Sequence, residues 1–421
     1  MTADPALSSR LIDQENRYGP GGQPNCEVVL TRADGGYVWD VQGNRYLDFM
    51  AGRAGLAQGH CHTRIAAAMV EQCLRLGLAG RPYRHDRLPP LLEKLCTLTG
   101  FEQAVCLEAG DTAAAALRAL GAWGRRQGIA PGQAECLVFA AAPREAPKGG
   151  AATAVLPVLD APLAPMPDAA ASSPRQPGPR LRVVPYGDLD AAAAAVRAGT
   201  VGILVEPVQG GCGVRLPPPG FLAGLRDLGR AHRLMVIADE RQCGLGRTGR
   251  RFAFEHEGVR PDGVILEHGL AGGFYPVGAL LGSRELLAGL APASVHAGNP
   301  LACAVASAAL DVLVDEKLEE RAAELGAYLL ERLRGLVGPH ERGSGGGQDH
   351  PKLQAVHGLG LWAELELRPE AGSARAAAEA LRQEGLLCAA CGASLLLSPP
   401  LTSTREQLDW ALGRLSRVLA D

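Results

Sequence analysis

Short apolar runs bounded by turn residues recur in the middle of the chain and predict buried strands. They occur at residues 136–141, 201–205, 235–238 and 264–266, and helical or loop sequence separates each run from the next. A helical spacing of apolar residues predicts helices over 63–76, 88–98 and 112–126, the last with Asp111 as its N-cap. Buried strands that alternate with helices predict an α/β fold whose large domain holds a mostly parallel sheet.

The two ends of the chain predict a second, smaller domain. Short strands are expected at 28–30, 36–40 and 45–49, after a polar lead-in over 11–27. Near the other end the pattern predicts a strand over 357–367, a helix over 373–384, a strand over 394–397 and a helix over 404–419. We expect residues 1–50 and 306–421 to form a smaller α+β domain beside a large domain of residues 51–305. The Pro-, Ala- and Gly-rich stretch 146–182 predicts a surface excursion.

The composition excludes several classes of protein. The chain has 421 residues, 47% of them hydrophobic and 21% charged, which excludes a disordered chain. Its 42 basic and 45 acidic side chains give a net charge of −3, which argues against nucleic acid and anionic membrane as partners. No run of about 18 apolar residues predicts a membrane helix. The polar N-terminus and the 11 cysteines, which we expect as reduced thiols without zinc-site spacing, favour a cytoplasmic protein with no bound metal.

Several motifs are informative because of their order along the chain. They are Gln58-Gly59-His60-Cys61-His62, Glu206-Pro207-Val208-Gln209-Gly210, Asp239-Glu240 with Gly244-Leu245-Gly246-Arg247-Thr248-Gly249, Gly272-Gly273-Phe274-Tyr275-Pro276-Val277 and Gly298-Asn299-Pro300. In these motifs the chain resembles the class III aminotransferases of pyridoxal-phosphate fold type I, and among them the ornithine aminotransferases most closely. The resemblance spans nearly the whole chain. It implies the fold type I architecture, pyridoxal phosphate as cofactor and a homodimer.

The resemblance also locates the position of the cofactor lysine, and this chain has another residue there. In the family a lysine ahead of the paired glycines holds the cofactor as a Schiff base, and His268 occupies that position here. Imidazole cannot form the imine, because a Schiff base needs a primary amine. His268 could act as a general base or could fill a vacated space, and we favour the second role. The chain's lysines are few, namely Lys94, Lys148, Lys317 and Lys352, and only Lys148 follows a large-domain strand.

The family's phosphate-binding turn is altered as well. At the helix N-terminus where amides and hydroxyls would hold the phosphate, the chain reads Leu107-Glu108-Ala109-Gly110-Asp111. We expect Glu108 to face the phosphate oxygens, and like charges about 4 Å apart repel by ~1–4 kcal/mol. A threonine that the partner subunit would contribute is replaced by Val295. The resemblance therefore predicts weak phosphate binding.

Other residues of the implied pocket are exchanged too, several of them for arginine. Arg144 stands near the position of the aromatic residue that stacks on the cofactor, Arg241 at that of the aliphatic residue on the other ring face, and Arg53 at that of a substrate tyrosine. Leu396 replaces the arginine that binds the substrate carboxylate. These arginines, with Arg84, either pair with nearby carboxylates and plug the pocket or line a new anion-binding site. We favour the plug.

Three residues keep the type that the family has. Asp239 would protonate the pyridine nitrogen, Gln242 would reach the ring hydroxyl, and Glu206 has a largely structural role in the family. Losses that cluster around one pocket on a retained scaffold favour an ornithine-aminotransferase-like pseudoenzyme that acts through binding or assembly. Two alternatives stay open. One is an active or repurposed pyridoxal-phosphate enzyme that uses His268 as a base, and the other is a regulatory subunit paired in a heterodimer with an active homologue.

Overall fold

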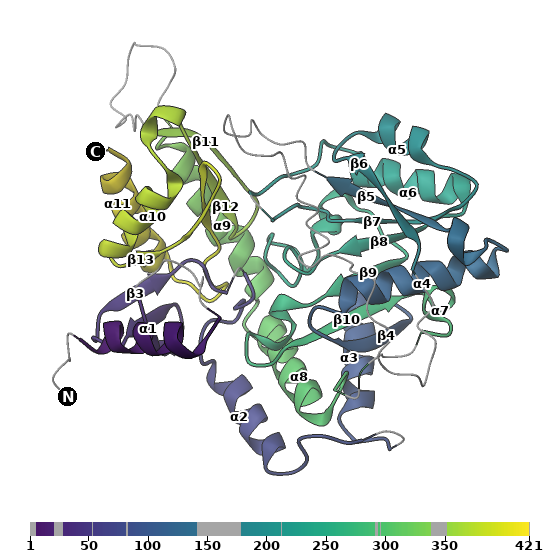
Figure 1. Ribbon diagram of the computed structural model, residues 1–421, viewed down its shortest axis with the longest axis horizontal. Coiled ribbons are helices and arrows are strands. Elements are labelled where there is room, and N and C mark those ends of the chain that lie inside the picture. Colours follow the sequence, from purple (N-terminus) through teal and green to yellow (C-terminus); the bar gives the residue numbers. More distant parts are fainter. Residues whose placement is uncertain are drawn as a thin grey trace.

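A seven-stranded sheet forms the centre of the larger part of the protein (Figure 1). The computed structural model describes residues 6–20, 28–52, 54–80, 83–140, 178–211, 213–290, 294, 296–337 and 352–420. The sheet consists of β4 (Gln103–Glu108), β5 (Glu135–Ala140), β6 (Arg180–Pro185), β7 (Thr200–Val205), β8 (Met235–Asp239), β9 (Gly263–Leu266) and β10 (Val277–Gly282). Its order is β4-β10-β9-β8-β7-β5-β6, and only β10 runs antiparallel to its neighbours. The mostly parallel sheet predicted from the apolar runs is confirmed.

Helices cover both faces of this sheet, which is why its central strands are apolar throughout. Leu204, Ile237 and Ile265 pack with α4 (Thr112–Arg126) and α7 (Arg284–Leu287) on one face. The alternate residues of the same strands, such as Ile203 and Val236, pack on the other face in the cluster that holds α6 (Phe221–His232) and α8 (Pro300–Asp315). The remaining helices of this part are α2 (Thr63–Cys73), α3 (Leu88–Thr99) and α5 (Leu189–Ala195).

Two four-stranded sheets lie beside the large one. The first has the order β1-β2-β3-β13 and joins β1 (Leu30–Asp34), β2 (Tyr37–Asp40) and β3 (Arg45–Asp48) to β13 (Leu386–Leu387). The second joins β11 (Leu353–Gly358), β12 (Ala363–Leu367), β15 (Ser394–Leu397) and β14 (Ala389–Cys391). Their helices are α9 (Leu318–Arg334), α10 (Ala374–Gln383) and α11 (Arg405–Ala420). Because β13 pairs with β3 in parallel, the two ends of the chain meet in one sheet.

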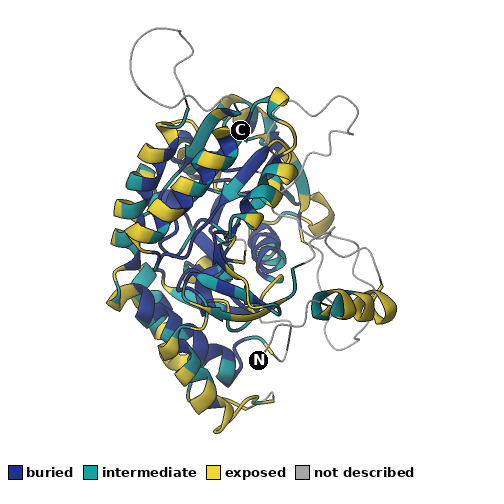
Figure 2. Cartoon of the chain, turned by 90° about the vertical axis from the view of Figure 1, so that its left-hand side faces the viewer, coloured by how far each residue is buried: buried dark blue, intermediate teal, exposed yellow. Residues whose placement is uncertain are grey.

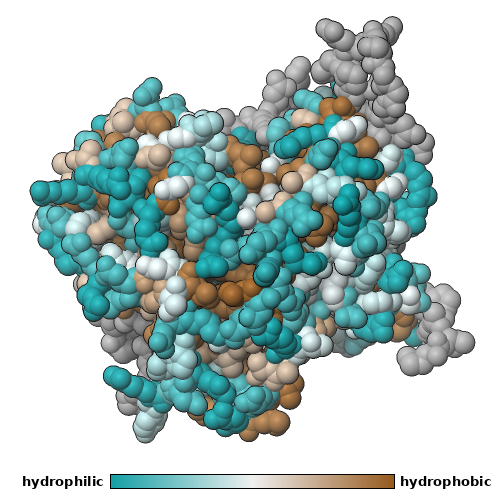
Figure 3. Space-filling view, turned by 180° about the vertical axis from the view of Figure 1, so that it is seen from behind, coloured by the Kyte–Doolittle hydropathy of each residue, from teal (hydrophilic) through white to brown (hydrophobic). Residues whose placement is uncertain are grey.

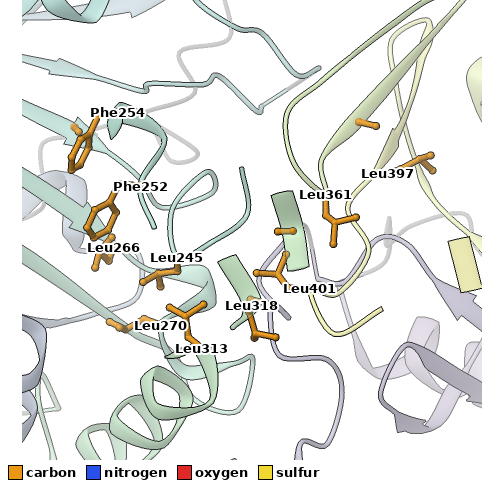
Figure 4. Packing of buried hydrophobic residues seen from close by; sticks show 14 of the residues in the cluster. Leu245, Phe252, Phe254, Leu266, Leu270, Leu313, Leu318, Leu361, Leu397 and Leu401 are labelled. Carbon is orange, nitrogen blue, oxygen red and sulfur yellow. The ribbon is translucent and has the colours of Figure 1, made fainter. Parts of the chain in front are cut away.

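One hydrophobic core runs from the large sheet into the smaller sheets. Figure 4 shows Leu266 and Leu270 of the large part on one side, Leu361 and Leu397 of the small sheets on the other, and Leu318 at the start of α9 between them. In Figure 2 the outer helices carry exposed residues on one side and buried residues on the other, as amphipathic surface helices do. Leu266 and Leu270, both fully buried, hold the chain on either side of the loop after β9.

The structure differs from the sequence predictions at several places. The single strand expected over 357–367 is wrong: a tight turn separates β11 from β12, with Gly360 at φ 61° and the Leu359 N–H donating to the Trp362 carbonyl (3.0 Å). The polar lead-in contains a helix, α1 (Leu7–Tyr18), which buries no residue. Asp111 lies at the N-cap position of α4 but does not cap it, because its carboxylate pairs with Arg118 (2.9 Å).

Within the described residues no helix is long and apolar enough to cross a membrane. The same part of the chain contains no group of three or more metal-ligating side chains. Buried free thiols include Cys106, Cys136, Cys243 and Cys303. Cys391 departs from the expectation of reduced thiols, because it is disulfide-bonded.

Candidate functional site

Acidic residues follow the carboxyl ends of neighbouring strands in the large sheet. Glu206 follows β7, Asp239 ends β8, and Glu267 with His268 follows β9. These strands are adjacent and parallel, so the side chains gather at one edge of the sheet, where open α/β sheets bind their ligands. Leu266 and Leu270, both fully buried, fix the backbone on either side of Glu267 and His268.

At one end of this site, the Asp239 carboxylate is paired with Arg241. The Arg241 Nε donates to Asp239 Oδ1 (2.9 Å), and its terminal nitrogen donates to Oδ2 (2.9 Å), so the contact is bidentate. The Asp239 side chain is only 2% exposed and that of Arg241 12%. Burial opposes the charge on Arg241, yet the carboxylates of Asp239, Glu267 and Glu206 raise its pKa above the ordinary value. Arg241 therefore stays charged, and its guanidinium covers the Asp239 carboxylate.

At the other end, the carboxylate of Glu267 accepts hydrogen bonds at the start of α4. The Gly110 N–H donates to Glu267 Oε1 (2.8 Å), and the Thr112 hydroxyl donates to Oε2 (2.6 Å). Glu267 and Thr112 are both buried. From the loop after β9, Glu267 thus holds the turn just before α4, which is where the resemblance places the phosphate-binding turn.

Sequence analysis missed Glu267 and chose Glu108 for this place. Glu108 instead accepts a hydrogen bond from the Ser294 hydroxyl (2.5 Å), and the predicted turn residues Ala109 and Gly110 are exposed. The signal that could have found Glu267 is its position: it directly follows a buried apolar strand and directly precedes the substituted lysine position.

A very small cavity lies at the Asp239 end of the site. Its lining contains His268 and four other residues predicted for the site, namely Glu206, Asp239, Arg241 and Gln242, together with Val208 and Cys243. The cavity measures about 10 Å³. That volume corresponds to about one water molecule, whereas sites for small molecules and cofactors span roughly 300–1,000 Å³.

His268 begins a short 3-10 helix, η3 (His268–Ala271), next to a loop of residues 54–57. A Cβ on Gly55 would lie 3.4 Å from the His268 Cβ, which places that loop directly over the histidine. Within the described part of the chain the imidazole of His268 makes no hydrogen bond to another side chain. That His268 fills a vacated space stays a prediction.

No described lysine reaches this cavity. The Lys94 Nζ lies 2.6 Å from Asp311 Oδ1 on α8, and the Lys352 Nζ donates to the Val418 carbonyl (3.2 Å). Lys317 is exposed at the N-cap of α9. Lys148 lies outside the described residues.

The structure describes only some of the predicted arginines. Arg241 lies in the site, whereas Arg84 is exposed and does not line the cavity. Arg53, Arg144 and Val295 lie outside the described residues. Of these two described arginines, Arg241 forms a salt bridge within the site.

Glu240, next to Asp239, has a structural environment. The N–H groups of Ala253 and Phe254 donate to its two oxygens (both 3.0 Å), and the Cys243 thiol lies 3.3 Å from Oε2. Burial raises the pKa of Glu240 to about 7, although these hydrogen bonds act in the opposite direction. Glu240 thus holds the segment at 253–254 rather than facing the cavity.

Comparison with known proteins decides the family. The sequence profile described as aminotransferase class-III matches residues 18–419. The chain belongs to the class III aminotransferases. Ornithine aminotransferase of Bordetella pertussis is 43% identical over 424 residues, covering 99% of this chain and 97% of that protein. Ornithine aminotransferase 2 of Staphylococcus aureus is 36% identical over 420 residues, covering 98% and 99%.

Solved structures of class III aminotransferases share the fold. Ornithine delta-aminotransferase of Plasmodium falciparum superimposes with a TM-score of 0.84 at 29% identity and covers 98% of each chain. Ornithine aminotransferase of Toxoplasma gondii has a TM-score of 0.84 at 30% identity, covering 99% of this chain and 96% of that one. The recognition of the family and of pyridoxal-phosphate fold type I from the sequence is confirmed.

Class III aminotransferases use pyridoxal phosphate, and the residues of this site do not fit that cofactor. The phosphate-binding turn already holds the Glu267 carboxylate, and the carboxylate expected at the pyridine nitrogen already holds Arg241. The described cavity beside Asp239, of about 10 Å³, is too small for the ring. No described lysine could form the Schiff base.

Proposed function

We propose that this class III aminotransferase homologue lacks ordinary transaminase activity and acts through binding or assembly. The observation that carries the proposal is His268 at the lysine position, lining a cavity too small for the cofactor. The Arg241–Asp239 pair supports it, because an aspartate held by a guanidinium is not available to a pyridine nitrogen. Leu396 adds to it, since an aliphatic residue leaves a substrate carboxylate without a partner.

A homodimer is the partner arrangement that we propose. Exposed apolar side chains on and after α2 support it: Val70 is 60% exposed, Leu74 84% and Tyr83 77%. Such side chains on neighbouring segments are typical of a surface that another subunit covers. Figure 3 shows apolar residues, in brown, on the face opposite to the one seen in Figure 1.

Light scattering at micromolar concentration should give twice the monomer mass, and Leu74→Lys should lower the measured mass. A stable monomer, or association only with an added active homologue, would contradict the homodimer.

The test of lost activity uses pyridoxal phosphate and borohydride. The purified chain is incubated with the cofactor, reduced, digested and analysed by peptide mass spectrometry, with an active ornithine aminotransferase treated in parallel. We expect a pyridoxyl-lysine in the active enzyme and none at stoichiometric level in this chain. A stoichiometric label on Lys148 or on another lysine would favour the alternative of a retained or repurposed pyridoxal-phosphate enzyme.

A further inference from the structure

The two poles of the cofactor site carry side chains whose charges match those of the missing cofactor. Glu267 brings an anion to the start of α4, and Arg241 brings a cation to Asp239. We infer that Glu267 and Arg241 act as built-in substitutes for the phosphate and the pyridinium of pyridoxal phosphate, and that they hold the site closed without a cofactor. This inference rests on the proposed function and deepens it, because it names the groups that exclude the cofactor.

The start of α4 favours an anion. α4 has 15 residues, and its first N–H groups have no partner within the helix. The aligned peptide dipoles add a partial positive charge there, which favours a carboxylate or a phosphate. Asp111, the residue placed to cap the helix, is drawn away by Arg118. Glu267 brings its carboxylate to this end of the helix, with one oxygen on the Gly110 N–H just before the helix and the other on the Thr112 hydroxyl.

The second pole is closed by a different chemical group. A pyridinium would offer Asp239 a single N–H, whereas Arg241 covers both carboxylate oxygens with a planar pair of donors. The negative charge of Glu267 also raises the pKa of Arg241, so the two substitutes attract each other. Because Arg241 is only two residues from Asp239 in sequence, its guanidinium stays at that carboxylate.

Glu267 occupies the anion position, so removing it should open that position to an added anion. Inorganic phosphate is the probe, titrated at constant ionic strength against chloride, with the melting temperature of the full chain as the readout. The wild type should show no saturable phosphate effect. Glu267→Gly should bind phosphate at least tenfold more tightly and gain melting temperature in a saturable manner.

Glu108→Ala is the matched control. It also removes a carboxylate beside this turn, but that carboxylate accepts its hydrogen bond from Ser294 and not from the turn. It should leave phosphate binding at the wild-type level. Glu267→Gln fills the same space without the charge, and it should gain phosphate affinity too, though less than the glycine variant. It decides the question if Glu267→Gly does not fold.

Three results would overturn the inference: saturable phosphate binding by the wild type, a gain in Glu108→Ala, or no gain in either Glu267 variant. A cofactor-labelled lysine in the wild type would instead overturn the proposed function. The two failures are distinguishable, since the phosphate titration needs neither pyridoxal phosphate nor turnover.

Discussion

The two ends of the site are closed in chemically different ways. At the start of α4, a carboxylate meets two neutral donors, the Gly110 N–H and the Thr112 hydroxyl. At the end of β8, a buried carboxylate meets a guanidinium. In the first case a lost carboxylate leaves neutral groups behind, and the exposed Gly110 can turn to water. In the second, a lost guanidinium leaves an unpaired charge inside the protein. The ring end should therefore be the more sensitive of the two.

Removal of the guanidinium is the sharpest way to test that difference. Because the Asp239 side chain is only 2% exposed, Arg241→Leu leaves an uncompensated buried charge. We expect the free energy of unfolding to fall by about 3–5 kcal/mol, measured by urea denaturation.

Two further variants control this experiment. Asp239→Asn combined with Arg241→Leu removes both charges and should recover most of the loss. Arg230→Leu breaks an ion pair with Asp227 whose side chains are 67% and 75% exposed, and it should change stability by less than ~0.5 kcal/mol. If Arg241→Leu lowers the free energy of unfolding as little as Arg230→Leu does, the ion pair does not stabilise the ring end.

The phosphate end should show a smaller effect. Glu267→Ala leaves the buried Thr112 hydroxyl without its acceptor, and we expect a loss of ~1–3 kcal/mol in the free energy of unfolding. Glu108→Ala, which loses only the contact with Ser294, should cost less. A greater loss in Glu108→Ala than in Glu267→Ala would mean that the wrong carboxylate has been placed at the turn.

A further, pH-dependent effect concerns a third buried carboxylate. Like Glu267, Glu240 meets only uncharged donors, and burial raises its pKa from 4.5 to about 7. The folded state therefore holds the proton more tightly than the unfolded state does. That stabilisation is complete below pH 4.5 and is lost as the pH rises toward 7. Urea denaturation across this range should show a falling contribution that Glu240→Gln removes, and an unchanged slope in that variant would contradict the assignment.

The sequence predicted the scaffold better than the closure of the site. The bounds of α4 and β15 match the apolar pattern residue for residue, because each buries a regular set of positions. Asp239, Arg241 and His268 were found from their places in retained motifs. Glu267 was not, because its role depends on a contact with Gly110, 157 residues away in sequence. The cap of α4 was missed for a local reason: the sequence favours Asp111, but Arg118 in the same helix pairs with its carboxylate.

The central claim is that the site's own side chains exclude the cofactor, and that the loss of the lysine is not the only obstacle to cofactor binding. The most direct test compares His268→Lys with the triple variant His268→Lys/Glu267→Gly/Arg241→Val, each incubated with pyridoxal phosphate and reduced with borohydride. The measured quantity is the fraction of chains labelled at position 268. We predict a label in the triple variant and little or none in the single one, where Glu267 still holds the turn and Arg241 still holds Asp239. Full labelling of His268→Lys alone, with ornithine turnover within about a hundredfold of an ordinary transaminase, would contradict the account.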